Sequence, residues 1–263
     1  MLTLLLLTTT GCKVPAFGWP RGITPQADRM LGLWKGSTVT ALIVGAFAVL
    51  AMLWAVVIYR KRDDKLPRQT SHNLGVEILF TFLPFVIVAG LFYYTVKDEN
   101  FVGKKTANPD VTIGVVGFRW NWQFRHIGAD NQPLAIETGR PSQEATLVLP
   151  VGKKIRFIET SPDVIHSFWV PAFLFKLDVI PGRRNQFEIS INKTGTYVGR
   201  CAELCGVDHD RMNFRVKVVS FEEYQAYLAG HPGIDSSGNP DASTDTTGGV
   251  TSTTATTSGS EAK

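Results

Sequence analysis

"TALIVGAFAVLAMLWAVVIY", residues 40–59, contains no charged residue, and the charge-free stretch extends from Lys35 to Arg60. A second charge-free stretch, "ILFTFLPFVIVAGLFYYTV", covers residues 78–96. About 20 apolar residues in a helix match the thickness of the hydrocarbon core of a bilayer. The two stretches therefore predict a hairpin of two transmembrane helices over residues 34–97. Pro84 lies in the second stretch, and membrane helices tolerate proline.

The short loop between the two predicted helices indicates their orientation. Its sequence, "RKRDDKLPR" at residues 60–68, contains five Lys and Arg residues. Loops rich in Lys and Arg remain on the cytoplasmic side of a membrane. We therefore expect a cell-membrane protein with both termini outside the cytoplasm. Everything after Lys97 is then extracytoplasmic.

The first residues form an apolar segment of another kind. Residues 1–11, "MLTLLLLTTTG", are uncharged and lead directly to Cys12. The end of this segment resembles the lipobox of bacterial lipoproteins, in which cleavage leaves a lipidated cysteine at the new N-terminus. We therefore expect a signal segment at residues 1–11, lipidation of Cys12, and an extracytoplasmic segment at residues 12–33. An uncleaved apolar end with a free thiol remains the alternative.

Residues 98–230 show the pattern of a β-domain. Apolar Phe187, Ile189 and Ile191 alternate with polar neighbours, and similar runs recur between turn sequences such as "PVGKK" and "NKTG". Period-two alternation in many short segments predicts a β-sandwich or barrel. We expect "GFRWNWQFR", residues 117–125, to be one strand with an aromatic face that mainly packs in the core. Residues 231–263 are rich in Ser, Thr and Gly, which predicts a disordered tail.

A cluster of sulfur and nitrogen donors lies near the end of the β-domain. "CAELCGVDHDRM", residues 201–212, places two cysteines, a histidine and a methionine within one loop, and His166 lies upstream in "SPDVIHSFWVP". Three interpretations are open: a structural zinc site, a redox dithiol as in thioredoxin-like copper-delivery proteins, and an electron-transfer copper site. Methionine has no role in a zinc site. Two thiolates with two imidazoles suit two copper ions better than one.

Several motifs together resemble a known family. "CAELCGVDHDRM", "DVIHSFWVP", "FKLDVIPGR" and "FRWNWQF" are similar to those of subunit II of cytochrome c oxidase, a haem–copper terminal oxidase. The resemblance covers nearly all of residues 20–225, and "GWPRGITPQA" is most like the actinobacterial members. It implies a two-helix membrane hairpin that carries a cupredoxin-like β-barrel. Quinol-oxidase relatives lack the metal ligands, so the resemblance excludes that branch.

The resemblance also implies the ligands of the metal site. The centre would be the dinuclear copper centre called CuA, with two copper ions. Its ligands would be His166, Cys201, the carbonyl oxygen of Glu203, Cys205, His209 and Met212. The side chain of Glu203 would reach a Mg or Mn ion at the interface with subunit I, with Asp178 nearby.

Further roles follow from the same resemblance. Trp120 would accept electrons from a cytochrome c above the copper. Glu77 would lie at the mouth of a proton channel, since an ionisable group at the edge of a membrane helix is a candidate for proton uptake. Electrons would pass through the copper to haem, which only the partner subunit I contains. Oxygen would be reduced to water there, coupled to proton pumping.

The charge of the chain bears on its partners. The net charge of +4 is modest and no basic aromatic motif is present, so we expect no nucleic acid as a partner. The outer domain has almost as many acidic as basic residues, and the chain contains no Cys–x–x–Cys–His haem motif. We therefore expect a membrane-tethered cytochrome c as donor, besides oxidase subunit I and other oxidase subunits. The alternative from another class is a copper-handling or thiol-exchange protein that services an oxidase.

Overall fold

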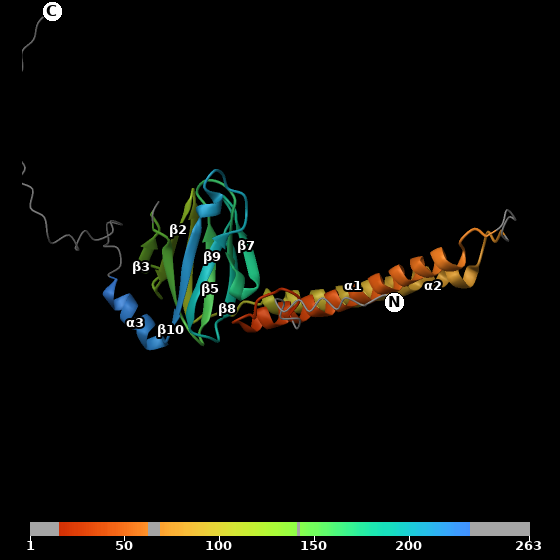
Figure 1. The fold of residues 1–263 in the computed structure, drawn as a ribbon. Helices are drawn as coiled ribbons and strands as arrows, with labels where there is room; N and C mark the ends of the chain where they lie inside the picture. Colours follow the sequence, from red (N-terminus) through yellow and green to blue (C-terminus); the bar gives the residue numbers. More distant parts are fainter. Residues whose placement is uncertain (1–15, 63–68, 141–142, 232–263) are drawn as a thin grey trace, which may run out of the picture.

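The computed structural model describes residues 16–62, 69–140 and 143–231 (Figure 1). Two long helices, α1 (Pro25–Ile58) and α2 (Leu74–Val102), are followed by ten strands and a short helix, α3 (Phe221–Gly230). The expected signal segment, Cys12 with its predicted lipidation, and the Ser/Thr-rich tail from residue 232 onward lie outside the described residues.

The two long helices have the length and exposure of membrane helices. α1 has 34 residues and α2 has 29, which correspond to about 51 Å and about 44 Å at 1.5 Å per residue. Their large apolar side chains face outward, and Phe47 and Phe85 are 74% and 70% exposed. Such surfaces require lipid or another protein as a covering. This confirms the prediction of two apolar membrane helices.

Local sequence signals fix where the helices begin. The Thr24 side chain accepts a hydrogen bond from the Ala27 amide, and Pro25 occupies the first turn. The Asn73 side chain caps α2 in the same way by accepting from the Val76 amide. A side-chain acceptor before the first turn satisfies an otherwise free N–H group. α1 therefore begins inside the segment 12–33 that was expected to precede the hairpin.

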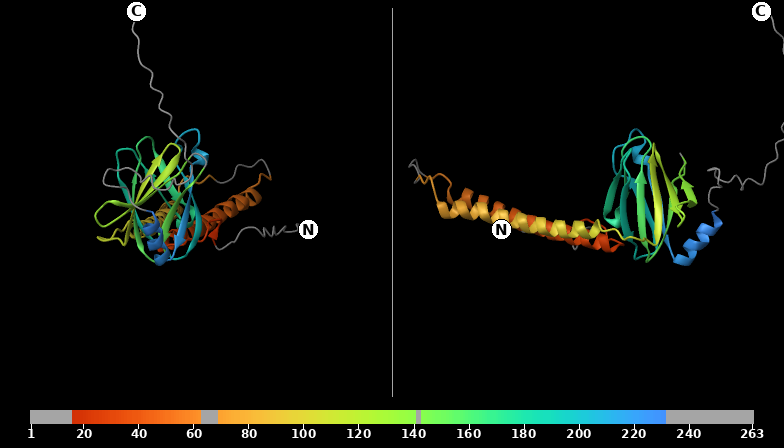
Figure 2. Two further views of the ribbon diagram at one scale, coloured as in Figure 1. Left: turned by 90° about the vertical axis from the view of Figure 1, so that its left-hand side faces the viewer. Right: turned by 180° about the vertical axis from the view of Figure 1, so that it is seen from behind.

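The hairpin and α3 lie on opposite sides of the β-domain (Figure 2). A partly buried polar network joins the hairpin to the β-domain at the segment that follows α2. The Glu188 carboxylate accepts hydrogen bonds from the backbone amide and hydroxyl of Thr106 and pairs with Arg156 at 2.9 Å. Gln26 of α1 donates to the Glu188 carbonyl oxygen. These contacts fix the outer domain to the hairpin.

The β-domain consists of two five-stranded sheets packed face to face. One sheet has the order β3-β2-β1-β5-β8 and the other β4-β10-β9-β6-β7. The strands of the first sheet are β1 (Val111–Phe118), β2 (Asn121–Ile127), β3 (Pro133–Thr138), β5 (Lys154–Thr160) and β8 (Asn185–Ser190). Those of the second are β4 (Ala145–Pro150), β6 (His166–Val170), β7 (Phe175–Val179), β9 (Gly195–Cys201) and β10 (Asn213–Val219).

Each sheet is antiparallel except for one pair of strands. β1 runs parallel to β5 and β4 runs parallel to β10, so both sheets are mixed. Buried side chains from both sheets fill the space between them, as in other β-sandwiches. A two-helix hairpin followed by a cupredoxin-like sandwich confirms the predicted fold class.

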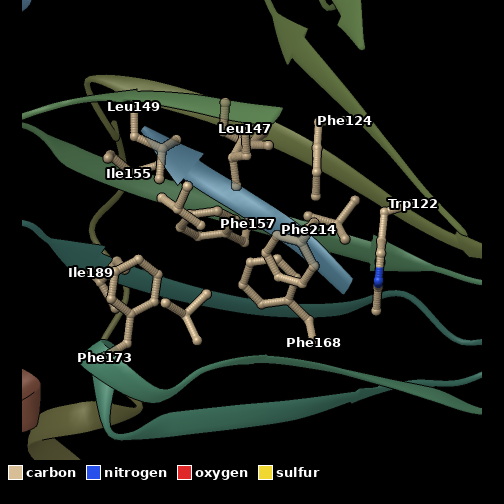
Figure 3. Packing of buried hydrophobic residues seen from close by; sticks show 14 of the residues in the cluster. Trp122, Phe124, Leu147, Leu149, Ile155, Phe157, Phe168, Phe173, Ile189 and Phe214 are labelled. Carbon is tan, nitrogen blue, oxygen red and sulfur yellow. The ribbon is translucent and has the colours of Figure 1, made fainter. Parts of the chain in front are cut away.

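Aromatic side chains dominate the core between the sheets (Figure 3). Phe168 and Phe214 stack with ring centroids 4.9 Å apart, and Phe157 stacks on Phe187 at 4.6 Å. Trp122 is fully buried and contacts Phe214 edge to face at 5.3 Å. Rigid rings from both sheets therefore pack against one another in the space between the sheets.

The structure corrects one prediction about the aromatic segment. Residues 117–125 do not form one strand, because the chain reverses between β1 and β2, with Phe118 opposite Asn121. Arg119 and Trp120 form the turn. A two-residue turn preserves the period of two, so alternation along the sequence cannot reveal the reversal. Trp122 and Phe124 are buried as expected, whereas Trp120 is half-exposed at the tip.

Candidate metal centre

The predicted ligands come together at one end of the second sheet. His166 begins β6, Cys201 ends β9, and these strands are neighbours, with Phe168 opposite Cys201. The loop after Cys201 returns through a short 3-10 helix, η3 (His209–Arg211), to β10. The amide of Cys201 donates to the Met212 carbonyl at 3.0 Å, which closes the loop. Strand pairing and loop closure thus bring His166 beside residues far along the chain.

The donor atoms lie around the two cysteine sulfurs. The Sγ atoms of Cys201 and Cys205 are 3.8 Å apart. His166 Nδ1 lies 3.9 Å from the Cys201 sulfur, and His209 Nδ1 lies 3.5 Å from the Cys205 sulfur. The sulfur of Met212 is 3.7 Å from Cys205 Sγ, and the Glu203 carbonyl oxygen is 3.3 Å from Cys201 Sγ. Each sulfur therefore has one imidazole, with one weaker donor beside each.

These separations fit metal ligands and not a disulfide. A disulfide requires sulfurs about 2.05 Å apart, and both cysteines are free and buried. Two sulfurs bound to one metal at about 2.3 Å with tetrahedral angles lie about 3.8 Å apart. The ligand atoms of His166, Cys201 and Cys205 also fall within 4.8 Å of one another. Thiolate, imidazole and thioether together form a donor set typical of copper sites.

The electrostatics of the sulfur pair favour a bound cation. Burial opposes ionisation of Cys201, but hydrogen bonds with His166 and the loop backbone lower its pKa to about 7. Burial and then the charge of Cys201 raise the pKa of Cys205 to about 12. One thiolate forms readily, and the second requires positive charge between the sulfurs. A metal ion supplies that charge, because it deprotonates the thiols that bind it.

Comparison with known proteins agrees with this site. Residues 14–97 match the family "Cytochrome C oxidase subunit II, transmembrane domain", and residues 111–219 match "Cytochrome C oxidase subunit II, periplasmic domain". The chain belongs to the cytochrome c oxidase subunit II family. It therefore has a CuA-type domain, and the resemblance inferred from the motifs is confirmed.

Two sequence relatives support the same assignment. The chain is 43% identical to a "Probable cytochrome c oxidase subunit 2" of Streptomyces coelicolor, over 86% of this chain and 83% of that protein. It is 36% identical to "Cytochrome c oxidase subunit 2" of Mycobacterium tuberculosis, over 87% and 79%. Among solved structures, the periplasmic domain of cytochrome oxidase subunit II of Bradyrhizobium japonicum is 33% identical over 48% of this chain and 96% of that one, with a TM-score of 0.43.

In this family member, His166 is held from behind by an aspartate. Asp163 Oδ1 lies 2.9 Å from His166 Nε2, which leaves Nδ1 facing the Cys201 sulfur. Burial opposes ionisation of Asp163, but hydrogen bonds with His166 and the amides of Arg119 and Val164 lower its pKa to about 2. A carboxylate behind a histidine fixes the ring and makes it a better ligand. The Asp–x–x–His spacing in the sequence was the available signal for this role.

Trp120 lies against the loop from Cys201 to Met212, which we call the copper loop. Its indole Nε1–H donates to the Cys205 carbonyl oxygen at 3.2 Å. Gly206 has a φ of +129°, and a Cβ atom there would lie 2.9 Å from Trp120 Nε1. The loop therefore needs glycine at this position, both for its backbone conformation and for the closeness of the indole.

The side chains of three other predicted residues are not among the donor atoms around the sulfur pair. The Glu203 side chain is half-buried. Asp178 lies on β7, half-exposed and 3.5 Å from Lys176. Glu77 lies in the first turn of α2, where it accepts a hydrogen bond from the Asn73 amide. Each has a structural contact or exposure of its own, and the structure does not bring Asp178 or Glu77 to the copper ligands.

The sequence analysis missed a buried carboxyl group. Glu159 on β5 is fully buried, and neither of its oxygens has a hydrogen-bond partner within the described residues. Burial, and then the charge of Asp178, raise the pKa of Glu159 well above its usual range. Burial inside the sandwich therefore favours the neutral form of Glu159. Its place two residues after Phe157 in an alternating strand was the available signal for a core position, but nothing in the sequence indicated its missing partners.

Proposed function

We propose that this chain is the subunit of a cytochrome c oxidase at which electrons enter. An electron from a cytochrome c would enter at Trp120 and leave toward haem in subunit I, where oxygen is reduced to water and protons are pumped. The observation that carries the proposal is the close cysteine pair with one histidine beside each sulfur. When bound, a dinuclear copper centre accepts and releases single electrons with little rearrangement.

The proposed ligands would bind the two copper ions in different ways. Cys201 and Cys205 would bridge both ions, because a 3.8 Å separation lets two metals share two sulfurs. His166 and His209 would each bind one ion. The sulfur of Met212 and the carbonyl oxygen of Glu203 would complete the two coordination shells. Burial of both cysteines, of His166 and of Met212 would exclude water from the site.

Trp120 is suited to receive electrons because it joins the surface to the ligand loop. Its ring is half-exposed, and one hydrogen bond connects its indole to the Cys205 carbonyl. A donor that docks over the ring would therefore lie close to a copper ligand.

The remaining roles concern partners and protons. We propose that the copper domain and both termini face away from the cytoplasm, with the basic loop after α1 inside. The Glu203 side chain would bind Mg or Mn at the interface with subunit I, with Asp178 near it. Glu77 would assist proton uptake at the cytoplasmic end of α2, where its hydrogen bond to the Asn73 amide places it at the helix end.

The surface around Trp120 supports a donor held in the same membrane. Several of its charges pair within the chain: Arg119 with Asp163 at 3.6 Å, Arg211 with Asp208 at 3.9 Å, and Arg215 with Glu144 at 3.1 Å. Internally paired charges steer a soluble partner only weakly. Tethering can replace steering, since it raises the effective concentration of the donor. We therefore propose a membrane-tethered cytochrome c.

Electron paramagnetic resonance of the copper-loaded full chain in detergent tests the site. We expect a mixed-valence dinuclear signal with two coppers per chain. Cys205→Ser should abolish that signal, whereas Cys12→Ser, which changes a cysteine outside the loop, should not. A single Cu(II) signal, or none, would instead favour a copper-handling or thiol-exchange protein. Retention of two coppers and the dinuclear signal in Cys205→Ser would contradict the ligand assignment.

A further inference from the structure

The turn between β1 and β2 contacts both halves of the copper site. β1 and β2 belong to the first sheet, whereas His166 begins β6 of the second sheet and the loop up to Met212 joins that sheet's strands β9 and β10. Three contacts cross from the tip of this hairpin to the ligand-bearing segments. They come from Arg119, Trp120 and Trp122.

The first contact reaches the histidine side of the site. The Arg119 amide donates to Asp163 Oδ2 at 2.7 Å, and the other carboxylate oxygen lies 2.9 Å from His166 Nε2. Asp163 thus connects the turn to the ring of His166 through its two carboxylate oxygens. β1 also approaches the same ring directly, because a Cβ atom at Gly117 would lie 3.3 Å from His166.

The other two contacts reach the sulfur side. Trp120 donates its indole N–H to the carbonyl oxygen of Cys205 at 3.2 Å. Trp122, two residues later, donates its indole N–H to the carbonyl oxygen of Met212 at 3.3 Å. The two tryptophans therefore hold both ends of the segment from Cys205 to Met212, which carries three of the five sulfur and imidazole donors.

We propose that the β1–β2 turn is a clamp that positions the copper ligands, and that Trp120 is a positioning residue as well as the point at which electrons enter. The proposal rests on the proposed copper site. Ligands held in place before the metal binds lose less conformational freedom on binding. Contacts behind metal ligands commonly change metal affinity by about 10-fold to 100-fold.

Trp120→Phe tests the sulfur side, because it keeps an aromatic ring but removes the indole N–H. The readout is the rate at which a copper chelator removes metal from the full chain in detergent, together with the paramagnetic resonance spectrum and the midpoint potential. We expect copper release about fivefold faster, which corresponds to one ordinary hydrogen bond. The copper hyperfine pattern should also change. Trp169→Phe is the matched control, since the Trp169 indole donates no hydrogen bond within the described parts of the chain.

Asp163→Asn tests the histidine side, and the double variant tests the clamp itself. Asp163→Asn should accelerate copper release by about 10-fold or more. If one turn holds both sides, the loss of either contact loosens the other. The increase in copper-release rate of the double variant should then be at least about threefold smaller than the product of the increases in the two single variants. Effects that multiply fully, or a Trp120→Phe chain that matches wild type in release rate and spectrum, would overturn the clamp. A wild-type chain without the dinuclear signal would instead overturn the copper site.

Discussion

Gly206→Ala adds one Cβ atom at the point where the copper loop contacts Trp120. The φ of +129° at this residue is unfavourable for any residue with a Cβ atom, at a cost of about 1–3 kcal/mol. The added Cβ would also lie 2.9 Å from Trp120 Nε1, so the indole must move and lose its hydrogen bond to Cys205. That hydrogen bond contributes about 1 kcal/mol.

Together these terms disfavour the native loop by about 2–4 kcal/mol. The loop can relax when copper is absent but must keep its geometry when copper is bound. The cost therefore falls on copper affinity and amounts to a loss of roughly 30-fold to 700-fold. Competition for copper between the full chain and a chelator of known affinity measures this loss.

Gly152→Ala provides the matched control. Gly152 also has a positive φ, +74°, but a Cβ atom there would meet nothing within 4 Å, and the residue lies in the turn between β4 and β5. We expect this change to lower the thermal midpoint of the β-domain and to leave copper affinity unchanged. Copper affinities within threefold of each other for the two variants would refute the reasoning about the loop.

Three further predictions concern other parts of the molecule. Burial, and then the charge of His231, lower the pKa of His126 to about 4. The unfolded chain therefore binds more protons than the folded chain below about pH 6.5, and the free energy of unfolding should fall by up to about 3 kcal/mol between pH 6.5 and 4. Thermal unfolding at several pH values should show this as a midpoint that decreases with acidity. A flat midpoint over that range would contradict this. Glu77→Gln should slow proton-coupled steps in the purified oxidase while copper reduction stays near normal; a change confined to copper reduction would reject the proton role. Oxygen consumption with native membranes should change little with ionic strength, because a tethered donor needs little long-range electrostatic attraction. Fast, salt-sensitive turnover with soluble basic cytochrome c would argue against a tethered donor.

The sequence by itself determined the features that depend on local pattern. Twenty uncharged residues in a row predict a membrane helix, because burial of apolar side chains in lipid depends only on length and composition. Alternation such as Phe187, Ile189 and Ile191 predicts strands with one buried face, and all three are buried. The kinds of donor in residues 201–212, with His166 upstream, indicated copper because ligand chemistry follows residue type.

Only the tertiary structure decided the features that join distant segments. The reversal at Arg119 and Trp120 could not be predicted, because a two-residue turn preserves the alternation of side chains. The roles of the two indole N–H groups depend on which carbonyl oxygens lie opposite them, Cys205 for Trp120 and Met212 for Trp122. Those oxygens are 85 and 90 residues away in sequence and lie in the loop between β9 and β10 of the other sheet. Hydrogen bonds between sheets depend on how the sheets pack, and a pattern within one strand carries no information about that packing.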